Sequence, residues 1–116
     1  MEVDWYQCKG GVWCELNKLD ISHPYLKGLK GVFMIWYEVG VKSVVLVGSG
    51  DIQNGLIEAR DSLAIQAFAK YRLFATWAEL PSSKMGAVHT YLSRKLKPTI
   101  PNPSVSSKII EVDLPW

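Results

Sequence analysis

The sequence predicts an α+β fold in which a small antiparallel sheet of three or more strands is flanked by helices. Residues 31–38 and 42–48 are short runs dense in β-branched, aliphatic and aromatic residues, and the three residues between them, centred on Gly40, are typical of a tight hairpin. Both runs are apolar on both faces, so the sheet needs a cover on each side. Helical patterns in the second half of the chain supply that cover.

Capping residues mark two helices after the hairpin. Asp51 is a suitable N-cap for a helix that extends to about Arg60. Asp61 or Ser62 can cap a second helix, which extends to about Ala69.

A third strand and a last helix complete the pattern. Residues 71–79 place small or apolar side chains alternately on two faces, which predicts a strand that is buried on both sides. A helix then opens at Pro81 or Ser82 and extends to about Leu96, where apolar residues recur at helical spacing and Pro98 prevents continuation.

The size of the chain favours one globular domain, because 116 residues and 13.0 kDa leave little room for a second core. Residues 1–30 are expected to form an N-terminal extension that packs on the domain and contributes an edge strand at 12–19. Residues 103–116 are expected to form an extended C-terminal tail that packs across the domain.

Neither the longest apolar region nor the first residues of the chain indicate a membrane or secreted protein. The longest apolar region, residues 31–50, is interrupted by Glu38 and Lys42 and lacks the roughly 20 uninterrupted apolar residues of a membrane-spanning helix. The chain starts with Met-Glu-Val-Asp-Trp, which is acidic where a secretory signal would be basic. We therefore expect a cytoplasmic protein without a membrane partner.

Cys8 and Cys14 are the only cysteines, and in a reducing compartment we expect them to be free thiols that flank a glycine turn. Together with the two histidines, His23 and His89, they offer the ligand types of a Cys2His2 zinc site. None of their spacings matches a familiar zinc module, so two small, partly buried cysteines are the preferred interpretation.

The basic residues are concentrated near the last helix. The whole chain has 13 basic and 11 acidic residues, whereas residues 80–110 contain no acidic residue at all. Such a segment can face phosphate groups or can form an ordinary solvated surface. DNA or RNA is therefore a candidate partner, and the candidate contacts are Lys84, Arg94, Lys95 and Lys97, with Lys108 as a fifth cation in the segment.

Two glycine-containing stretches carry a family resemblance. Gly31-Val32-Phe33 and Leu46-Val47-Gly48, with the loop Ser49-Gly50-Asp51-Ile52 after the second, resemble the strands and loop of the GIY-YIG nuclease superfamily. That family also has a later helix that ends in a proline followed by an asparagine, as Pro98 and Asn102 do here. The resemblance covers residues 31–102 and implies a GIY-YIG endonuclease-like domain, and the flanks resemble stand-alone bacterial members.

The resemblance implies hydrolysis of phosphodiesters with one divalent metal held by a glutamate, a tyrosine that helps to activate water and an arginine that supports the phosphate. All of these positions differ here. Phe33 and Leu46 stand where the family has tyrosines, Gly55 aligns with the arginine, and His89 aligns with the metal-binding glutamate. Phe33 and Leu46 have no hydroxyl that could move a proton. The fold positions are thus kept while the catalytic positions are replaced.

Three functions follow as expectations. The first is a non-catalytic module that binds nucleic acid through the basic last helix and needs no cofactor. The second is a divergent metal-dependent nuclease in which His89 binds Mn, Mg or Zn, although a packing role explains a lone histidine beside an apolar helix stripe better. The third is a protein-interaction or homo-oligomerising unit, which an exposed patch formed by Trp5, Trp13 and Trp116 would favour.

Overall fold

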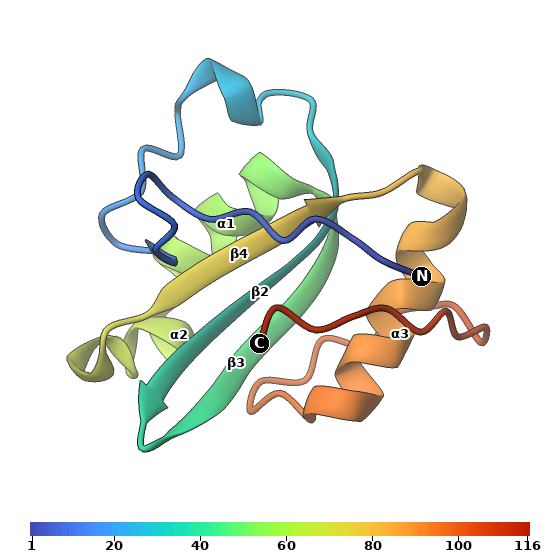
Figure 1. The fold of residues 1–116 in the computed structure, drawn as a ribbon. Coiled ribbons are helices and arrows are strands. Elements are labelled where there is room, and N and C mark those ends of the chain that lie inside the picture. The colour runs from blue at the N-terminus through green and yellow to red at the C-terminus, as the bar shows by residue number, and fades with distance from the viewer.

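A four-stranded antiparallel sheet with the strand order β1-β4-β2-β3 forms the centre of the molecule in the computed structural model, which describes residues 1–116 (Figure 1). The predicted α+β class is confirmed. The strands are β1 (Cys14–Glu15), β2 (Lys30–Val39), β3 (Val41–Asp51) and β4 (Phe74–Glu79). The helices are α1 (Ile52–Asp61), α2 (Leu63–Gln66) and α3 (Ser82–Leu96), with short 3-10 helices η1 (Pro24–Leu26) and η2 (Ala69–Tyr71).

The hairpin formed by β2 and β3 contains a β-bulge. Gly40 forms the turn with a φ of 77°, a left-handed conformation that favours glycine. The register shifts between Ile35 and Trp36, where Val45 is the extra residue on the opposite strand. Val45 and Leu46 therefore pack on the same face of the sheet, although neighbours in a regular strand alternate.

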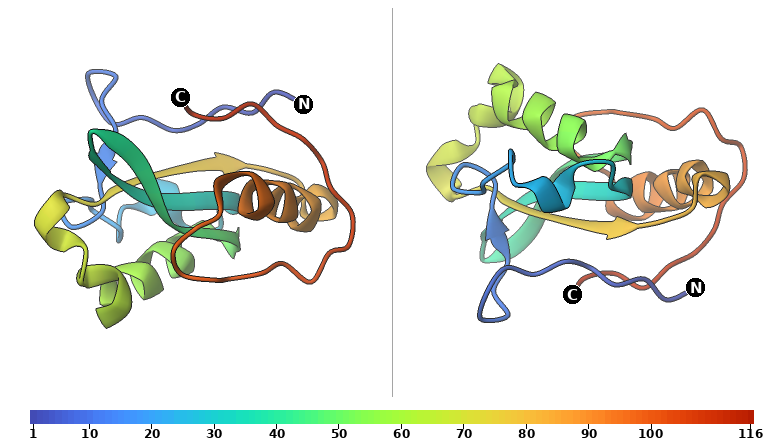
Figure 2. Two further views of the ribbon diagram at one scale, coloured as in Figure 1. Left: turned by 90° about the horizontal axis from the view of Figure 1, so that it is seen from below. Right: turned by 90° about the horizontal axis from the view of Figure 1, so that it is seen from above.

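The sheet is buried on both faces, as its apolar strands require. One face packs against α1, α2 and the segment around η1, and the other packs against α3 and the two terminal segments; Figure 2 shows α1 and α2 opposite the termini. The alternation of β2 divides its side chains between these two cores. Phe33 and Ile35 lie in the first core, and Val32, Met34 and Trp36 lie in the second.

Both edges of the sheet are covered along part of their length. On the β4 side, the Tyr6 N–H donates to the Trp77 carbonyl at 2.9 Å, and β1 continues the pairing further along. On the β3 side, the N–H groups of Thr99 and Ile100 donate to the carbonyls of Val44 and Val45. Covered edges limit unwanted strand pairing between molecules.

The two termini lie side by side over the second core (Figure 2). The Met1 ammonium donates to the Glu111 carbonyl at 2.9 Å, and the Asp113 N–H donates to the Met1 carbonyl at 3.3 Å. The side chain of Val112 in this tail is buried.

Two of the three tryptophans expected to form an exposed patch, Trp13 and Trp116, pack against the buried Trp36. Trp13 meets Trp36 edge-on at 5.4 Å between ring centroids, and Trp116 lies 5.0 Å from the same ring. Trp5 donates through its indole nitrogen to the Asp113 carbonyl. Among the three, only Trp116 is exposed, at 40%.

Three element boundaries differ from the sequence-based expectation. The edge strand expected at 12–19 is only Cys14–Glu15, because the chain turns away from β4 after the Leu16 N–H donates to the Leu73 carbonyl. The second helix ends at Gln66, and the third strand begins at Phe74 because η2 occupies the intervening residues.

None of the helices has the length and apolarity needed to cross a membrane.

The expectation of free thiols was wrong, because Cys8 and Cys14 form a disulfide. Gly10 and Gly11 have φ values of 85° and 71°, which fold the chain back tightly. The turn brings the two Cα atoms to within 5.1 Å of each other, inside the range in which a disulfide forms.

Candidate functional site

The structure brings together three of the four residues that the resemblance places at catalytic positions. Phe33 on β2, Leu46 on β3 and Gly55 on α1 line one pocket of about 240 Å³. Asn102 closes the same pocket from the segment that follows α3. His89 does not line the pocket, but its imidazole is hydrogen-bonded to the backbone carbonyl of Asn102, which does.

The phenyl ring of Phe33 fills the space between β3 and α1. The ring is 4% exposed, and a Cβ added at either Gly48 or Gly55 would overlap with its edge. These two glycines are needed for room, since neither has a positive φ. An aromatic ring without a polar atom therefore occupies the place to which the resemblance assigns a water-activating tyrosine.

His89 is a buried hydrogen-bonding residue that connects three segments. Its Nε2 lies 2.7 Å from the Asn102 carbonyl oxygen, which can only accept, so this nitrogen carries the proton. Its Nδ1 lies 2.7 Å from Ser49 Oγ and accepts a hydrogen bond from that hydroxyl. Asn102 in turn donates from its side-chain nitrogen to the Val47 carbonyl at 3.0 Å.

Burial lowers the pKa of His89 below its ordinary value, and the hydrogen bond to Asn102 opposes this shift only in part. The imidazole is therefore neutral at pH 7, with its one free lone pair directed at Ser49. A metal ion would have to displace the Ser49 hydroxyl to reach that lone pair. The metal-ligand role of His89 stays a prediction, and the hydrogen bonds account for its burial by themselves.

The pocket contains one ionisable side chain, Glu58. Arg60, the nearest arginine in sequence to Gly55, points elsewhere and donates to the Leu19 carbonyl at 2.9 Å. The pocket therefore has neither a guanidinium to support a phosphate nor a second carboxylate.

The four candidate nucleic-acid contacts are divided between the two ends of α3. Arg94, Lys95 and Lys97 are exposed at its C-terminal end, and none of them is part of an ion pair. Lys84 lies in the first turn, about 16 Å away along a helix that rises 1.5 Å per residue. Its ammonium contacts the sulfur of Met1 at 3.9 Å.

The four possible zinc ligands do not come together. Cys8 and Cys14 are bonded to each other, and His23 caps η1 by accepting a hydrogen bond from the Tyr25 N–H at 3.1 Å. No group of three or more histidine, cysteine, aspartate or glutamate side chains is arranged to hold a metal ion.

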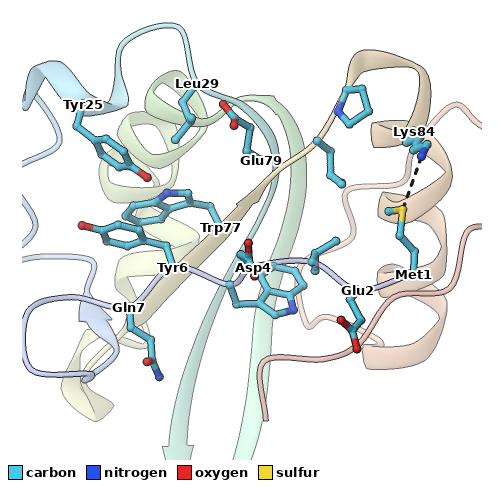
Figure 3. Close-up of a pocket in the computed structure, with 14 residues that line it drawn as sticks. Met1, Glu2, Asp4, Tyr6, Gln7, Tyr25, Leu29, Trp77, Glu79 and Lys84 are labelled. Carbon is cyan, nitrogen blue, oxygen red and sulfur yellow. Dashed lines mark hydrogen bonds between the residues drawn. The ribbon is translucent and has the colours of Figure 1, made fainter.

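A second site was not predicted from the sequence. A groove of about 680 Å³ runs between the N-terminal segment Met1–Gln7 and the outer edge of β4 (Figure 3). Aromatic rings of Tyr6, Tyr25 and Trp77 gather at one end, and Glu79 stands beside them. The acidic and aromatic residues among the first six were the available signal, but the Thr76 hydroxyl that binds the Tyr6 carbonyl lies 70 residues further along the chain, on β4.

Comparisons with models of protein families, with curated proteins and with solved structures found no match. The GIY-YIG resemblance of residues 31–102 stays a prediction.

Proposed function

We propose that this protein is a non-catalytic, GIY-YIG-like module that binds DNA or RNA through the C-terminal end of α3. The observation that supports the proposal is the cluster formed by Arg94, Lys95 and Lys97, which are all exposed and lack ion-pair partners. No carboxylate occurs between residues 80 and 110 to neutralise them. Free cations on one surface attract phosphate groups and release their counterions on binding.

The pocket between β3 and α1 supports the non-catalytic part of the proposal. Activation of water for phosphodiester hydrolysis needs a group that moves a proton and a charge that stabilises the phosphate. The ring of Phe33 fills the space between β3 and α1, and Glu58 is the one ionisable group in the lining of the pocket. Loss of a positioned general base or charge stabiliser typically lowers the rate by about 100-fold or more.

The binding test uses fluorescence anisotropy with labelled double-stranded DNA and single-stranded RNA of 20 nucleotides. The triple variant Arg94→Gln/Lys95→Gln/Lys97→Gln is compared with Lys9→Gln/Lys27→Gln/Lys30→Gln, which removes the same charge from exposed lysines elsewhere. We expect the first variant to weaken binding at least about 10-fold and to reduce the salt slope by about one unit per lost phosphate contact. Equal losses in the two variants would contradict the proposal.

The nuclease alternative is tested in parallel on supercoiled plasmid and single-stranded RNA with Mg, Mn or Zn. A proven nuclease serves as the positive control, and His89→Ala with a confirmed native circular dichroism spectrum serves as the site variant. We expect no cleavage. Nicking by the wild type that disappears in His89→Ala would replace the proposal with a divergent metal-dependent nuclease.

The oligomer alternative is tested by sedimentation of the protein alone over a range of concentrations. A concentration-dependent dimer with no effect of DNA or RNA would favour the interaction unit instead.

A further inference from the structure

The groove beside the N-terminal segment has an exposed floor of unpaired backbone. In the antiparallel pairing of β2 with β4, the backbone N–H and C=O groups of Ala78 and Leu80 point toward β2, because the Leu80 N–H donates to the Lys30 carbonyl. The N–H and C=O groups of Glu79 therefore point to the outer edge. No backbone group of the chain pairs with them, since the last contact on this edge is between Tyr6 and Trp77.

The N-terminal segment leaves this edge open because it turns away from β4 at Tyr6. The Tyr6 carbonyl accepts from the Thr76 hydroxyl at 2.7 Å, and the preceding residues cross to the C-terminal tail. The groove thus lies along β4 between the crossing segment on one side and Tyr25 and Leu29 on the other, as Figure 3 shows.

Trp77 lines the same groove, and its buried indole N–H has no partner. Trp77 is 2% exposed, and its Nε1 forms no hydrogen bond. One face of its ring stacks on Tyr6 at 4.5 Å between centroids, and Tyr25 lies 5.5 Å from Tyr6. A buried donor of this kind is normally satisfied by an acceptor, and the unpaired state costs about 1–3 kcal/mol.

The middle of the groove is negatively charged. Asp4 and Glu79 are exposed beside the aromatic rings, and neither is part of an ion pair. The two cations of the lining, the Met1 ammonium and Lys84, lie together at the end next to α3 (Figure 3). The Met1 ammonium is already engaged by the Glu111 carbonyl.

We propose that this groove binds an extended basic peptide segment of another protein, which adds a short strand to the free edge of β4 at Glu79. A peptide backbone supplies an acceptor and a donor for the Glu79 N–H and C=O. A lysine or arginine side chain then reaches Asp4 and the Glu79 carboxylate, while apolar parts pack on Tyr6 and Tyr25. A peptide satisfies the unpaired backbone groups of Glu79 and the charge together, whereas a simple organic cation satisfies the charge alone.

This groove is separate from the proposed nucleic-acid surface. Arg94, Lys95 and Lys97 lie at the far end of α3, and the middle of the groove would repel phosphate. The two proposals therefore fail or hold independently.

The binding test uses two hexapeptide pools that differ in one feature, lysine or glutamate fixed at alternate positions. Each pool is added at millimolar concentration to ¹⁵N-labelled protein, and the indole resonance of Trp77 and the backbone amide resonance of Glu79 are followed. The spectrum of Trp77→Phe identifies the indole signal among those of the five tryptophans. We expect the lysine pool to shift both resonances and the glutamate pool to leave them in place.

The mode of binding is tested by a third pool with the same lysines and an N-methyl group on every peptide nitrogen. This pool keeps the side chains but cannot donate to β4, so we expect it to lose at least about 10-fold in affinity. The variants Asp4→Lys and Glu79→Lys are expected to lose at least about 10-fold with the unmethylated pool. Asp61→Lys, the same change at an exposed residue at the end of α1, is the matched control and is expected to change the affinity less than twofold.

Three results would overturn the proposal. They are unchanged Trp77 and Glu79 resonances with the lysine pool, equal affinity for the lysine and glutamate pools, and equal affinity for the methylated and unmethylated pools. The variant Arg94→Gln/Lys95→Gln/Lys97→Gln is expected to bind the peptide pool as the wild type does, which separates this site from the nucleic-acid surface.

Discussion

Ser49 and His89 join β3 to α3 through a hydrogen bond of 2.7 Å between the serine hydroxyl and the imidazole Nδ1. On its other side the imidazole donates to Asn102, which also reaches back to β3. His89 thus fixes both the last helix and the segment that covers the edge of β3. Replacement of His89 by alanine leaves the Ser49 hydroxyl and the Asn102 carbonyl without a partner and opens a cavity. We expect a loss of about 2–4 kcal/mol in the free energy of unfolding, measured by urea denaturation.

The lowered pKa of His89 predicts that stability depends on pH. Between the folded-state pKa and the unfolded value near 6.5, the unfolded chain binds a proton that the folded chain does not. The contribution of His89 to the free energy of unfolding is therefore full above pH 6.5. It is lost as the pH falls toward the folded-state pKa, by at most about 1.4 kcal/mol per pH unit.

Urea denaturation of the wild type, His89→Gln and His23→Gln between pH 5 and 8 measures this dependence. The slope of the free energy of unfolding against pH should diminish in His89→Gln and persist in His23→Gln, because the His23 side chain is exposed at η1. Equal slopes in all three proteins would show that His89 is not the group responsible.

The close fit between Phe33 and Gly55 predicts a strong coupling between the two positions. In the wild type, Gly55→Ala should destabilise the fold by about 1–3 kcal/mol, because the new methyl group meets the phenyl ring. In the background of Phe33→Ala, the same change should stabilise the fold by about 0.5–1 kcal/mol, since alanine favours a helix over glycine and the space is free. A double-mutant cycle by chemical denaturation measures the coupling, and additive effects would contradict the packing described.

The sheet and helices were predictable because their signals are local. The turn at Gly40, the cap at Asp51 and the stop at Pro98 are each encoded within a few residues of the boundary they set. The bulge at Val45 was not predictable, because it depends on the register with β2. The pairing of Met1 with Glu111 joins residues 110 apart, and no local pattern encodes such a contact.

The candidate site was predictable only in part. Phe33, Leu46 and Gly55 come together because neighbouring strands and the helix that follows them place successive motif positions side by side. The role of His89 depends on Ser49 and Asn102, which approach it from different segments. The groove at Glu79 depends on where the N-terminal segment leaves β4, which is a property of the tertiary structure.

The disulfide between Cys8 and Cys14 predicts an effect of reduction on stability. Closure of a loop this short restricts the unfolded chain by an amount worth about 2 kcal/mol. We therefore expect the midpoint of urea unfolding to fall when dithiothreitol is added, whereas Cys8→Ser/Cys14→Ser should show no response to the reductant. Because a reducing cytoplasm keeps thiols unpaired, alkylation of the native protein in fresh lysate, followed by mass spectrometry, also tests the cytoplasmic expectation.

The buried hydroxyl of Thr76 anchors the N-terminal segment, because it donates to the Tyr6 carbonyl at 2.7 Å and is fully buried. Thr76→Val keeps the volume but leaves that carbonyl unsatisfied, so we expect a loss of about 1–2 kcal/mol. Thr76→Ser keeps the hydroxyl and removes a methyl group, and it should retain the anchor. Hydrogen exchange measured by mass spectrometry should therefore accelerate in residues 1–8 of Thr76→Val and stay near the wild-type rate in Thr76→Ser. Acceleration of equal size in both variants would mean that packing of the methyl group, and not the hydrogen bond, holds the wall of the groove in place.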